Sequence, residues 1–201
     1  MNDIKATLSE YDFVLVIDKS GSMAEPVKVG STTSRWQAVQ EQAIQFARDV
    51  GEIDTDGIGL VLFSGSGIVV EDGVSADKVR EVFASNSPRG GTPLAAALTE
   101  AFKLAGKSAK KDFVVVFTDG VPDNETEAAN VIKAQANKQD ADDALTVLFV
   151  QVGNDSSATD YLRRLDNSLV GAKFDIVDAK TFEEVDKFAT TAELIAAAIA
   201  D

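Results

Sequence analysis

The chain has 201 residues, of which 45% are hydrophobic, so it is long and apolar enough for one globular domain. It has no cysteine and no histidine. This excludes a disulfide scaffold, a cysteine nucleophile, a Ser-His-Asp triad and the usual zinc and copper sites. Its 33 acidic and 19 basic residues give a net charge of −14, which disfavours a nucleic-acid partner because phosphates are bound by basic surfaces. Any metal must be held by oxygen, as Mg²⁺, Mn²⁺ and Ca²⁺ are.

Short, continuous apolar runs alternate with segments in which apolar residues recur at helical spacing. Such runs are typical of strands buried on both faces of a parallel sheet. In chain order we expect a strand Phe13–Asp18, a helix from a Ser34 cap to Gly51, strands Ile58–Phe63 and Ile68–Val70, helices Ala76–Phe83 and Pro93–Ala105, a strand Phe113–Thr118, a helix Glu125–Asn137, a strand Leu145–Val150, a helix Ala158–Leu165, a weaker strand Phe174–Val177 and a helix Phe182–Ala200.

The order of these elements predicts an α/β fold. We expect a Rossmann-like, doubly wound and mostly parallel sheet with helices on both faces. The link Ser64-Gly65-Ser66-Gly67 is too short for a crossover, so Ile68–Val70 is predicted to be a short antiparallel edge strand. We find no internal repeat or linker, and we expect one domain over residues 1–201 with residues 1–10 as an N-terminal extension.

Two absences bear on the expected compartment. No apolar segment approaches the ~20 residues of a membrane span. The first residues, Met1 to Asp12, lack the basic start and long apolar core of a signal peptide. We therefore expect a cytoplasmic protein without membrane contact.

The residues that follow the core strands suggest a metal site. Because side chains two apart on extended backbone point the same way, Asp18, Ser20 and Ser22 can converge on one point. If the first strand lies beside Phe113–Thr118, Asp119 joins them, and Thr92 adds a fifth oxygen from the intervening loop. Five oxygens with two carboxylates suit an octahedral dication that keeps some water. Thr92 has an alternative role as the N-cap of a helix with Pro93 at its first position.

Three motifs then resemble those of von Willebrand factor type A (VWA) domains. They are Asp18-Lys19-Ser20-Gly21-Ser22, Gly91-Thr92-Pro93-Leu94 and Phe117-Thr118-Asp119-Gly120, in the family's order. The resemblance implies the VWA fold and a metal-ion-dependent adhesion site for Mg²⁺, with Mn²⁺ or Ca²⁺ as substitutes. It implies that Ser20 and Ser22 ligate directly, that Thr92 ligates directly or through water, and that Asp18 and Asp119 act through water. A carboxylate from a partner protein, Asp or Glu, would complete the coordination.

We therefore expect a protein-binding module rather than an enzyme, an accessory subunit of a larger intracellular complex such as an AAA-ATPase or stress-response assembly. One alternative is a Mg²⁺-dependent phosphohydrolase with Asp18 as nucleophile, although such enzymes usually carry a second acid where this chain has Ser20. A VWA domain with a vestigial metal site is the other. In that case Asp18, Ser20 and Ser22 are only turn residues, and Asp119 belongs to an Asp-Gly turn.

Overall fold

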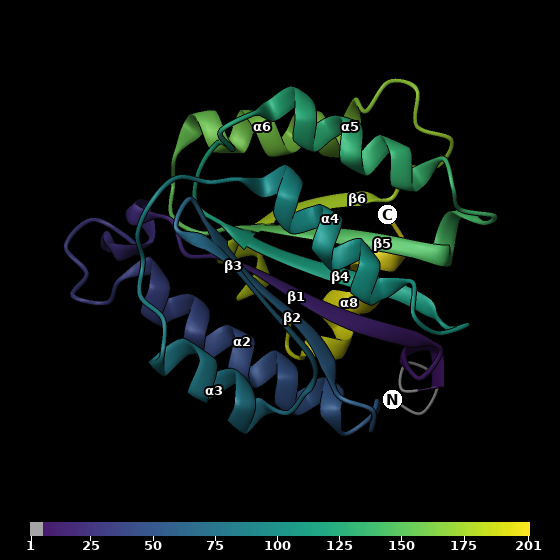
Figure 1. The fold of residues 1–201 in the computed structure, drawn as a ribbon, viewed down its shortest axis with the longest axis horizontal. Helices are drawn as coiled ribbons and strands as arrows, with labels where there is room; N and C mark the ends of the chain where they lie inside the picture. The colour runs from purple at the N-terminus through teal and green to yellow at the C-terminus, as the bar shows by residue number, and fades with distance from the viewer. Residues whose placement is uncertain (1–5) are drawn as a thin grey trace.

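The computed structural model describes residues 6–201, which form a six-stranded sheet with helices on both faces (Figure 1). The strand order is β3-β2-β1-β4-β5-β6, and every neighbouring pair is parallel except the hairpin of β2 and β3. The predicted α/β fold with one antiparallel edge strand is thereby confirmed. The strands are β1 (Tyr11–Asp18), β2 (Ile58–Ser64), β3 (Gly67–Val74), β4 (Lys111–Thr118), β5 (Leu145–Gln151) and β6 (Val177–Thr181).

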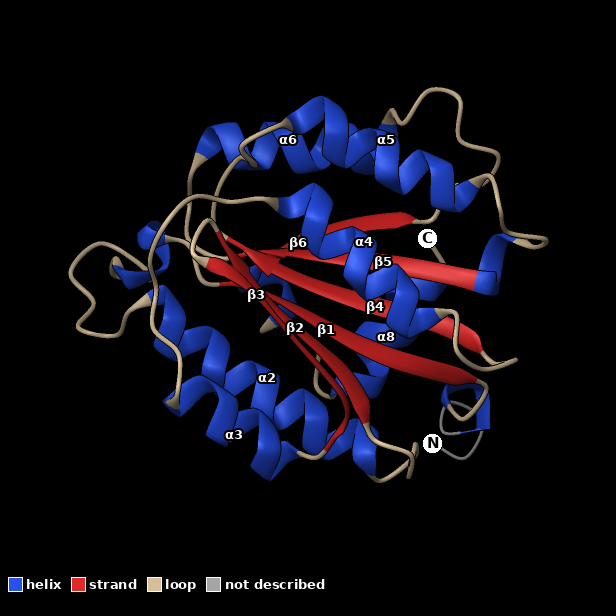
Figure 2. Ribbon diagram, in the orientation of Figure 1, coloured by secondary structure: helices blue, strands red, loops and turns tan. Residues whose placement is uncertain are grey.

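The helices divide between the two faces of the sheet (Figure 2). Side chains of α2, α3, α7 and α8 pack into the core on one face, and those of α4, α5 and α6 pack on the other. Within residues 6–201, no helix combines the length and apolar character needed to cross a bilayer. The helices are α2 (Arg35–Gly51), α3 (Ala76–Ala84), α4 (Leu94–Ala105), α5 (Glu125–Ala136), α6 (Ser156–Asn167), α7 (Phe182–Val185) and α8 (Thr191–Ile199), with 3₁₀ turns η1 (Gly21–Ala24) and η2 (Asp142–Ala144).

The central strand β1 shows why the apolar runs are continuous. Phe13, Leu15 and Ile17 point into the core beneath α2, whereas Val14 and Val16 point into the core beneath α4. Because successive side chains of a strand face opposite ways, a strand covered on both faces needs apolar residues at every position.

The start of α2 is fixed locally. Ser34 and Gln37 form a reciprocal capping box, in which the Ser34 side chain accepts from the Gln37 amide and the Gln37 side chain accepts from the Ser34 amide. Trp36 packs against Phe83 of α3, with ring centroids 4.4 Å apart. The predicted cap at Ser34 is confirmed, and the helix begins with Arg35 at the edge of the sheet where β1 ends.

The last predicted strand is misplaced. We expected it at Phe174–Val177, but β6 spans Val177–Thr181 and contains Asp178, Lys180 and Thr181. β6 is the outer strand and pairs only with β5, so it does not need to be apolar at every position. Its polar composition is what hid it from the sequence pattern.

The predicted helix Phe182–Ala200 is two helices. α7 ends at Val185, and α8 begins only after Thr190, whose side chain accepts a hydrogen bond from the amide of Glu193. A threonine cap of this kind starts a new helix, and the five residues between the helices let the chain change direction. The extension predicted at residues 1–10 lies partly outside the described residues; within it, Leu8 is buried in the core that includes α2 and α8. The domain boundary stays a prediction.

Candidate metal centre

The candidate site lies where the winding of the sheet reverses. β1 and β4 are parallel neighbours in register from Tyr11 opposite Lys111 to Ile17 opposite Phe117, and the chain continues outward from them in opposite directions. In open α/β sheets, ligands bind beyond the carboxyl ends of strands at such a point. Asp18 is the last residue of β1, and Asp119 follows the last residue of β4, so the two carboxylates lie at the same end of the sheet.

The oxygens of two separated motifs meet at this end of the sheet. The hydroxyl oxygens of Ser20 and Ser22 are 3.1 Å apart and share a hydrogen bond. The Ser22 hydroxyl also donates to Oδ1 of Asp119, 2.9 Å away and 97 residues along the chain. Alternation along the first motif predicted that Ser20 and Ser22 point the same way, and the expected pairing of the first strand with Phe113–Thr118 predicted that Asp119 joins them.

Asp18 lies behind the hydroxyls and is fully buried. Its Oδ1 accepts from the backbone amide of Ser20 at 2.7 Å, and its Oδ2 accepts from the hydroxyl of Thr118 at 2.8 Å. Burial, with a smaller contribution from the charge of Asp119, raises the pKa of Asp18 to about 6, although the hydrogen bonds from Ser20 and Thr118 oppose the rise. Within residues 6–201 this deeply buried carboxylate forms no ion pair, which is an electrostatic reason to expect a metal cation nearby.

Asp119 has a cationic neighbour that the sequence analysis missed. Nη1 of Arg35, in the first turn of α2, lies 2.7 Å from Oδ2 of Asp119, whose side chain is completely covered. The same nitrogen lies 3.4 Å from the carbonyl oxygen of Ser22 and 3.3 Å from a carboxylate oxygen of Glu25. The sequence showed Arg35 at a helix start, but no spacing rule relates it to a residue 84 positions later.

Thr92 is where a prediction about local structure fails. We expected it to cap α4 with Pro93 as the first helical residue, but α4 begins at Leu94, and Pro93 occupies the cap position without a side-chain hydrogen bond. Thr92 is held instead by its backbone, which exchanges two hydrogen bonds of 3.0 Å with Asp123. Asp123 therefore lies directly beside the Thr92 loop.

The failed capping role leaves the Thr92 hydroxyl free for a ligand. Within residues 6–201 it makes no hydrogen bond, although Thr92 is 8% exposed. Thr92 lies in the loop next to the first motif, since the amide of Gly21 donates to the carbonyl of Gly90 at 2.9 Å.

The residues present fit a small, hard cation. In the described part of the chain, no group of three or more His, Cys, Asp or Glu side chains could hold a metal, so hydroxyl oxygens must contribute. Mg²⁺ binds oxygen at about 2.0–2.1 Å in octahedral geometry, which places adjacent ligands about 2.9 Å apart. The 3.1 Å between the hydroxyls of Ser20 and Ser22 is close to that spacing.

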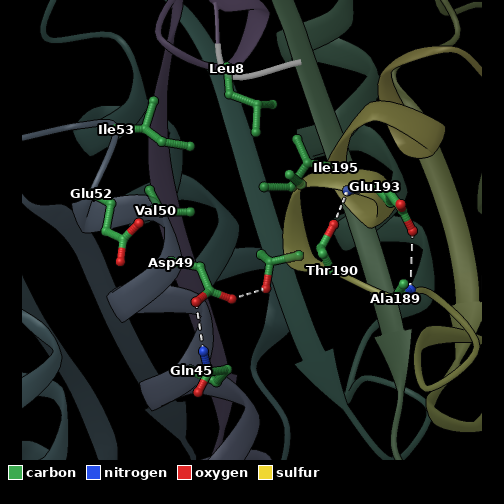
Figure 3. Close-up of a pocket in the computed structure, with 12 residues that line it drawn as sticks. Leu8, Gln45, Asp49, Val50, Glu52, Ile53, Ala189, Thr190, Glu193 and Ile195 are labelled. Atoms are coloured by element: carbon green, nitrogen blue, oxygen red, sulfur yellow. Dashed lines mark hydrogen bonds between the residues drawn. The ribbon is translucent and has the colours of Figure 1, made fainter. Parts of the chain in front are cut away.

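A cavity separate from the candidate metal site lies between α2 and α8. It has a volume of about 620 Å³ and is formed where the end of α2 meets the start of α8 (Figure 3). Asp49 lines the cavity and accepts hydrogen bonds from the side chains of Gln45 in α2 and Thr191 in α8. Arg35, beside the candidate metal site, and Gly51, near this cavity, are the two ends of α2. The helix has 17 residues and is about 24 Å long, so the cavity is remote from the metal site.

A model of the von Willebrand factor type A domain matches residues 13–121. The chain belongs to this family. The match includes all five predicted site residues: Asp18, Ser20, Ser22, Thr92 and Asp119. A search among curated proteins found no match.

Three solved structures share the fold of this chain. The PilB minor pilin from Streptococcus sanguinis matches with a TM-score of 0.69 and 14% identity, over 95% of this chain and 60% of that chain. Manganese-loaded TRAP from Plasmodium vivax matches with a TM-score of 0.61 and 16% identity, over 89% and 71%. The SpRpn10 VWA domain matches with a TM-score of 0.57 and 12% identity, over 85% and 88%. This chain thus spans about 60% of the length of the pilin.

Proposed function

We propose that this chain is a Mg²⁺-dependent protein-binding module. Asp18, Ser20, Ser22, Thr92 and Asp119 hold the ion, and an Asp or Glu of a partner protein completes its coordination. VWA domains are in general adhesion and interaction modules, and TRAP of the same fold was crystallised with manganese. The observation that carries the proposal is the meeting of the Ser20 and Ser22 hydroxyls with the Asp119 carboxylate beside the buried Asp18.

The chemistry of the ion favours a carboxylate ligand. Asp18 and Asp119 balance the two charges of the ion, and the guanidinium of Arg35 lies between the carboxylates of Asp119 and Glu25. A partner's carboxylate supplies the hard oxygen that Mg²⁺ prefers. The long-range field of a chain with charge −14 opposes acidic surfaces, so we expect the docking acid to lie on a neutral or basic surface.

The phosphohydrolase alternative is less well supported by the geometry. Its nucleophile would be Asp18, but this carboxylate is fully buried and both oxygens accept hydrogen bonds, from Ser20 and Thr118. An attacking carboxylate must reach the phosphorus atom of its substrate. Asp18 is better placed to order the loop of Ser20 and Ser22.

Calorimetric titration of the chelator-treated protein with MgCl₂ and MnCl₂ tests the metal site. We expect one site in the wild type and none in Ser20→Ala or Ser22→Ala. Ser157→Ala, which removes an exposed serine at the start of α6, is the matched control and should bind as the wild type does. Absence of any metal effect on heat release and melting temperature would support the vestigial-site alternative.

Affinity capture with and without chelator then tests the docking mechanism. Captured proteins should be released by chelator, and they should not be captured by Asp18→Ala or Ser20→Ala. Capture that is unchanged in chelator would reject docking through the metal. Membership of an AAA-ATPase or stress-response complex, and the cytoplasmic location, stay predictions from the sequence.

A further inference from the structure

Beside the candidate metal site, the side chains of Lys19 and Arg89 both contact the hydroxyl of Ser66. Lys19 lies between Asp18 and Ser20, but its side chain turns to the opposite side, where Nζ is 3.2 Å from the hydroxyl of Ser66 and 3.3 Å from that of Ser64. Nε of Arg89 is also 3.2 Å from the Ser66 hydroxyl. The two serines belong to the hairpin turn of β2 and β3, whose role the proposed metal site leaves unexplained.

In the part of the chain that the structure describes, Lys19 and Arg89 form no ion pair, although acidic residues outnumber basic ones by 33 to 19. Lys19 is only 3% exposed, and a buried lysine is normally paired with a carboxylate.

The hydrogen bonds at this point have more donors than acceptors. The Ser66 hydroxyl can accept from both Lys19 and Arg89 and has one proton to donate, to the Ser64 hydroxyl 2.7 Å away. The Ser64 oxygen, with two lone pairs, also faces Lys19 and the amide of Ser66. A carboxylate or phosphate would supply the charged acceptors that this cluster lacks.

Lys19, Arg89 and Ser66 lie on loops that are hydrogen-bonded to one another and that also carry residues of the candidate metal site. The amide of Arg89 donates to the carbonyl of Lys19 at 2.8 Å, and the amide of Gly65 donates to the carbonyl of Gly91 at 2.9 Å. A Cβ added to Gly65 would lie 2.8 Å from the nitrogen of Gly91, so the hairpin turn sits directly on the loop before Thr92. Since consecutive Cα atoms are 3.8 Å apart, Arg89 and Thr92 are separated by no more than about 11 Å.

We propose that Lys19, Arg89 and Ser66 form an anion site that receives a second acidic side chain of the same partner protein. Arg89 and Ser66 are exposed and contact the anion, while Lys19 lies beneath them and contributes its charge through the Ser66 hydroxyl. The partner segment therefore carries two acids, one for the metal and one for this site. This two-point docking rests on the proposed function, but the anion site itself does not require the metal.

The anion site is tested first without metal. Chelator-treated, ¹⁵N-labelled protein is titrated with sodium phosphate, and with NaCl at equal ionic strength. We expect saturable, phosphate-specific shifts of the amides of residues 65–67 and 89–91. Arg89→Gln should reduce them strongly, whereas Arg163→Gln, which removes an exposed arginine of α6 that forms no ion pair in residues 6–201, should not. Absent shifts, or equal shifts in Arg89→Gln, would overturn the proposal.

The two-point docking is tested with Mg²⁺ and two capped peptides, Glu-Gly-Gly-Glu and Glu-Gly-Gly-Gln. We expect the peptide with two acids to bind about tenfold more tightly, and this advantage to disappear in Arg89→Gln but not in Arg163→Gln. If phosphate binds but neither peptide binds with Mg²⁺, docking through the metal fails and the second docking point fails with it. If the peptides bind equally with Mg²⁺ and phosphate gives no shifts, the anion site is refuted and the proposed function stands.

Discussion

Replacing Arg35 with methionine removes the cation that pairs with Asp119. The arginine side chain is 13% exposed and that of Asp119 is fully covered, so the carboxylate would be left buried without its cation and with the hydrogen bond from the Ser22 hydroxyl. Breaking a buried pair by removing one member typically costs about 3–5 kcal/mol, and because Arg35 keeps some contact with water we expect about 3 kcal/mol. For a chain of this size that lowers the melting temperature by about 6–12 °C in the absence of metal.

A bound dication should reverse part of this loss. The metal would take over the neutralisation of Asp119 and would no longer be repelled by the guanidinium beside it. If it restores about half of the lost stability, its apparent affinity rises about tenfold relative to the wild type. Arg35→Met should therefore show a larger melting shift on addition of MgCl₂ than the wild type does.

Differential scanning calorimetry with chelator and with saturating MgCl₂ measures both effects. Arg48→Met, in which an exposed arginine of the same helix is replaced, is the control and should change neither value appreciably. An Arg35→Met protein that is equally destabilised with and without Mg²⁺ would refute the reasoning, because Asp119 would then not be part of a metal site.

Two further predictions separate the site from the rest of the molecule. Thr92→Val removes a hydroxyl with no hydrogen bond, so without metal its melting temperature should equal that of the wild type, whereas its Mg²⁺-induced melting shift should shrink; an undiminished shift would exclude Thr92 as a ligand. Burial, and then Asp12 opposite it on β1, raise the pKa of Asp112 to about 7, so the folded state holds a proton that the unfolded state loses above pH ~4. The wild type should lose stability relative to Asp112→Asn between about pH 4 and pH 7, by on the order of 2 kcal/mol after allowing for solvent screening of this half-buried group. Equal pH profiles of melting temperature would contradict this.

The sequence predicted well those features that repeat locally. β1, β2, β4 and β5 were found within two residues at each end because strands covered on both faces require uninterrupted apolar residues. The hairpin at Gly65 was recognisable because so short a link permits no crossover. β6 was misplaced because an outer strand with one neighbour tolerates residues such as Asp178 and Lys180.

The candidate site was predictable only in part, for the same physical reason. Asp18, Ser20 and Ser22 lie on one stretch of chain, where alternation determines direction, and Asp119 follows from the parallel pairing of β1 with β4. Contacts such as that of Arg35 with Asp119 depend on where a helix start docks against a distant loop, which no periodicity encodes.

The cations that the sequence analysis overlooked change the net charge around the candidate metal site. The charged residues of the three metal-bearing loops and the adjoining start of α2 are the acids Asp18, Glu25, Asp119 and Asp123 and the bases Lys19, Lys28, Arg35 and Arg89. Four negative and four positive charges cancel, and a dication would add two positive charges. A surface that is neutral without metal and positive with it would attract an acidic partner only when loaded, although the chain as a whole carries −14. Association should then be slowed by salt in the presence of Mg²⁺, because added ions screen the local attraction.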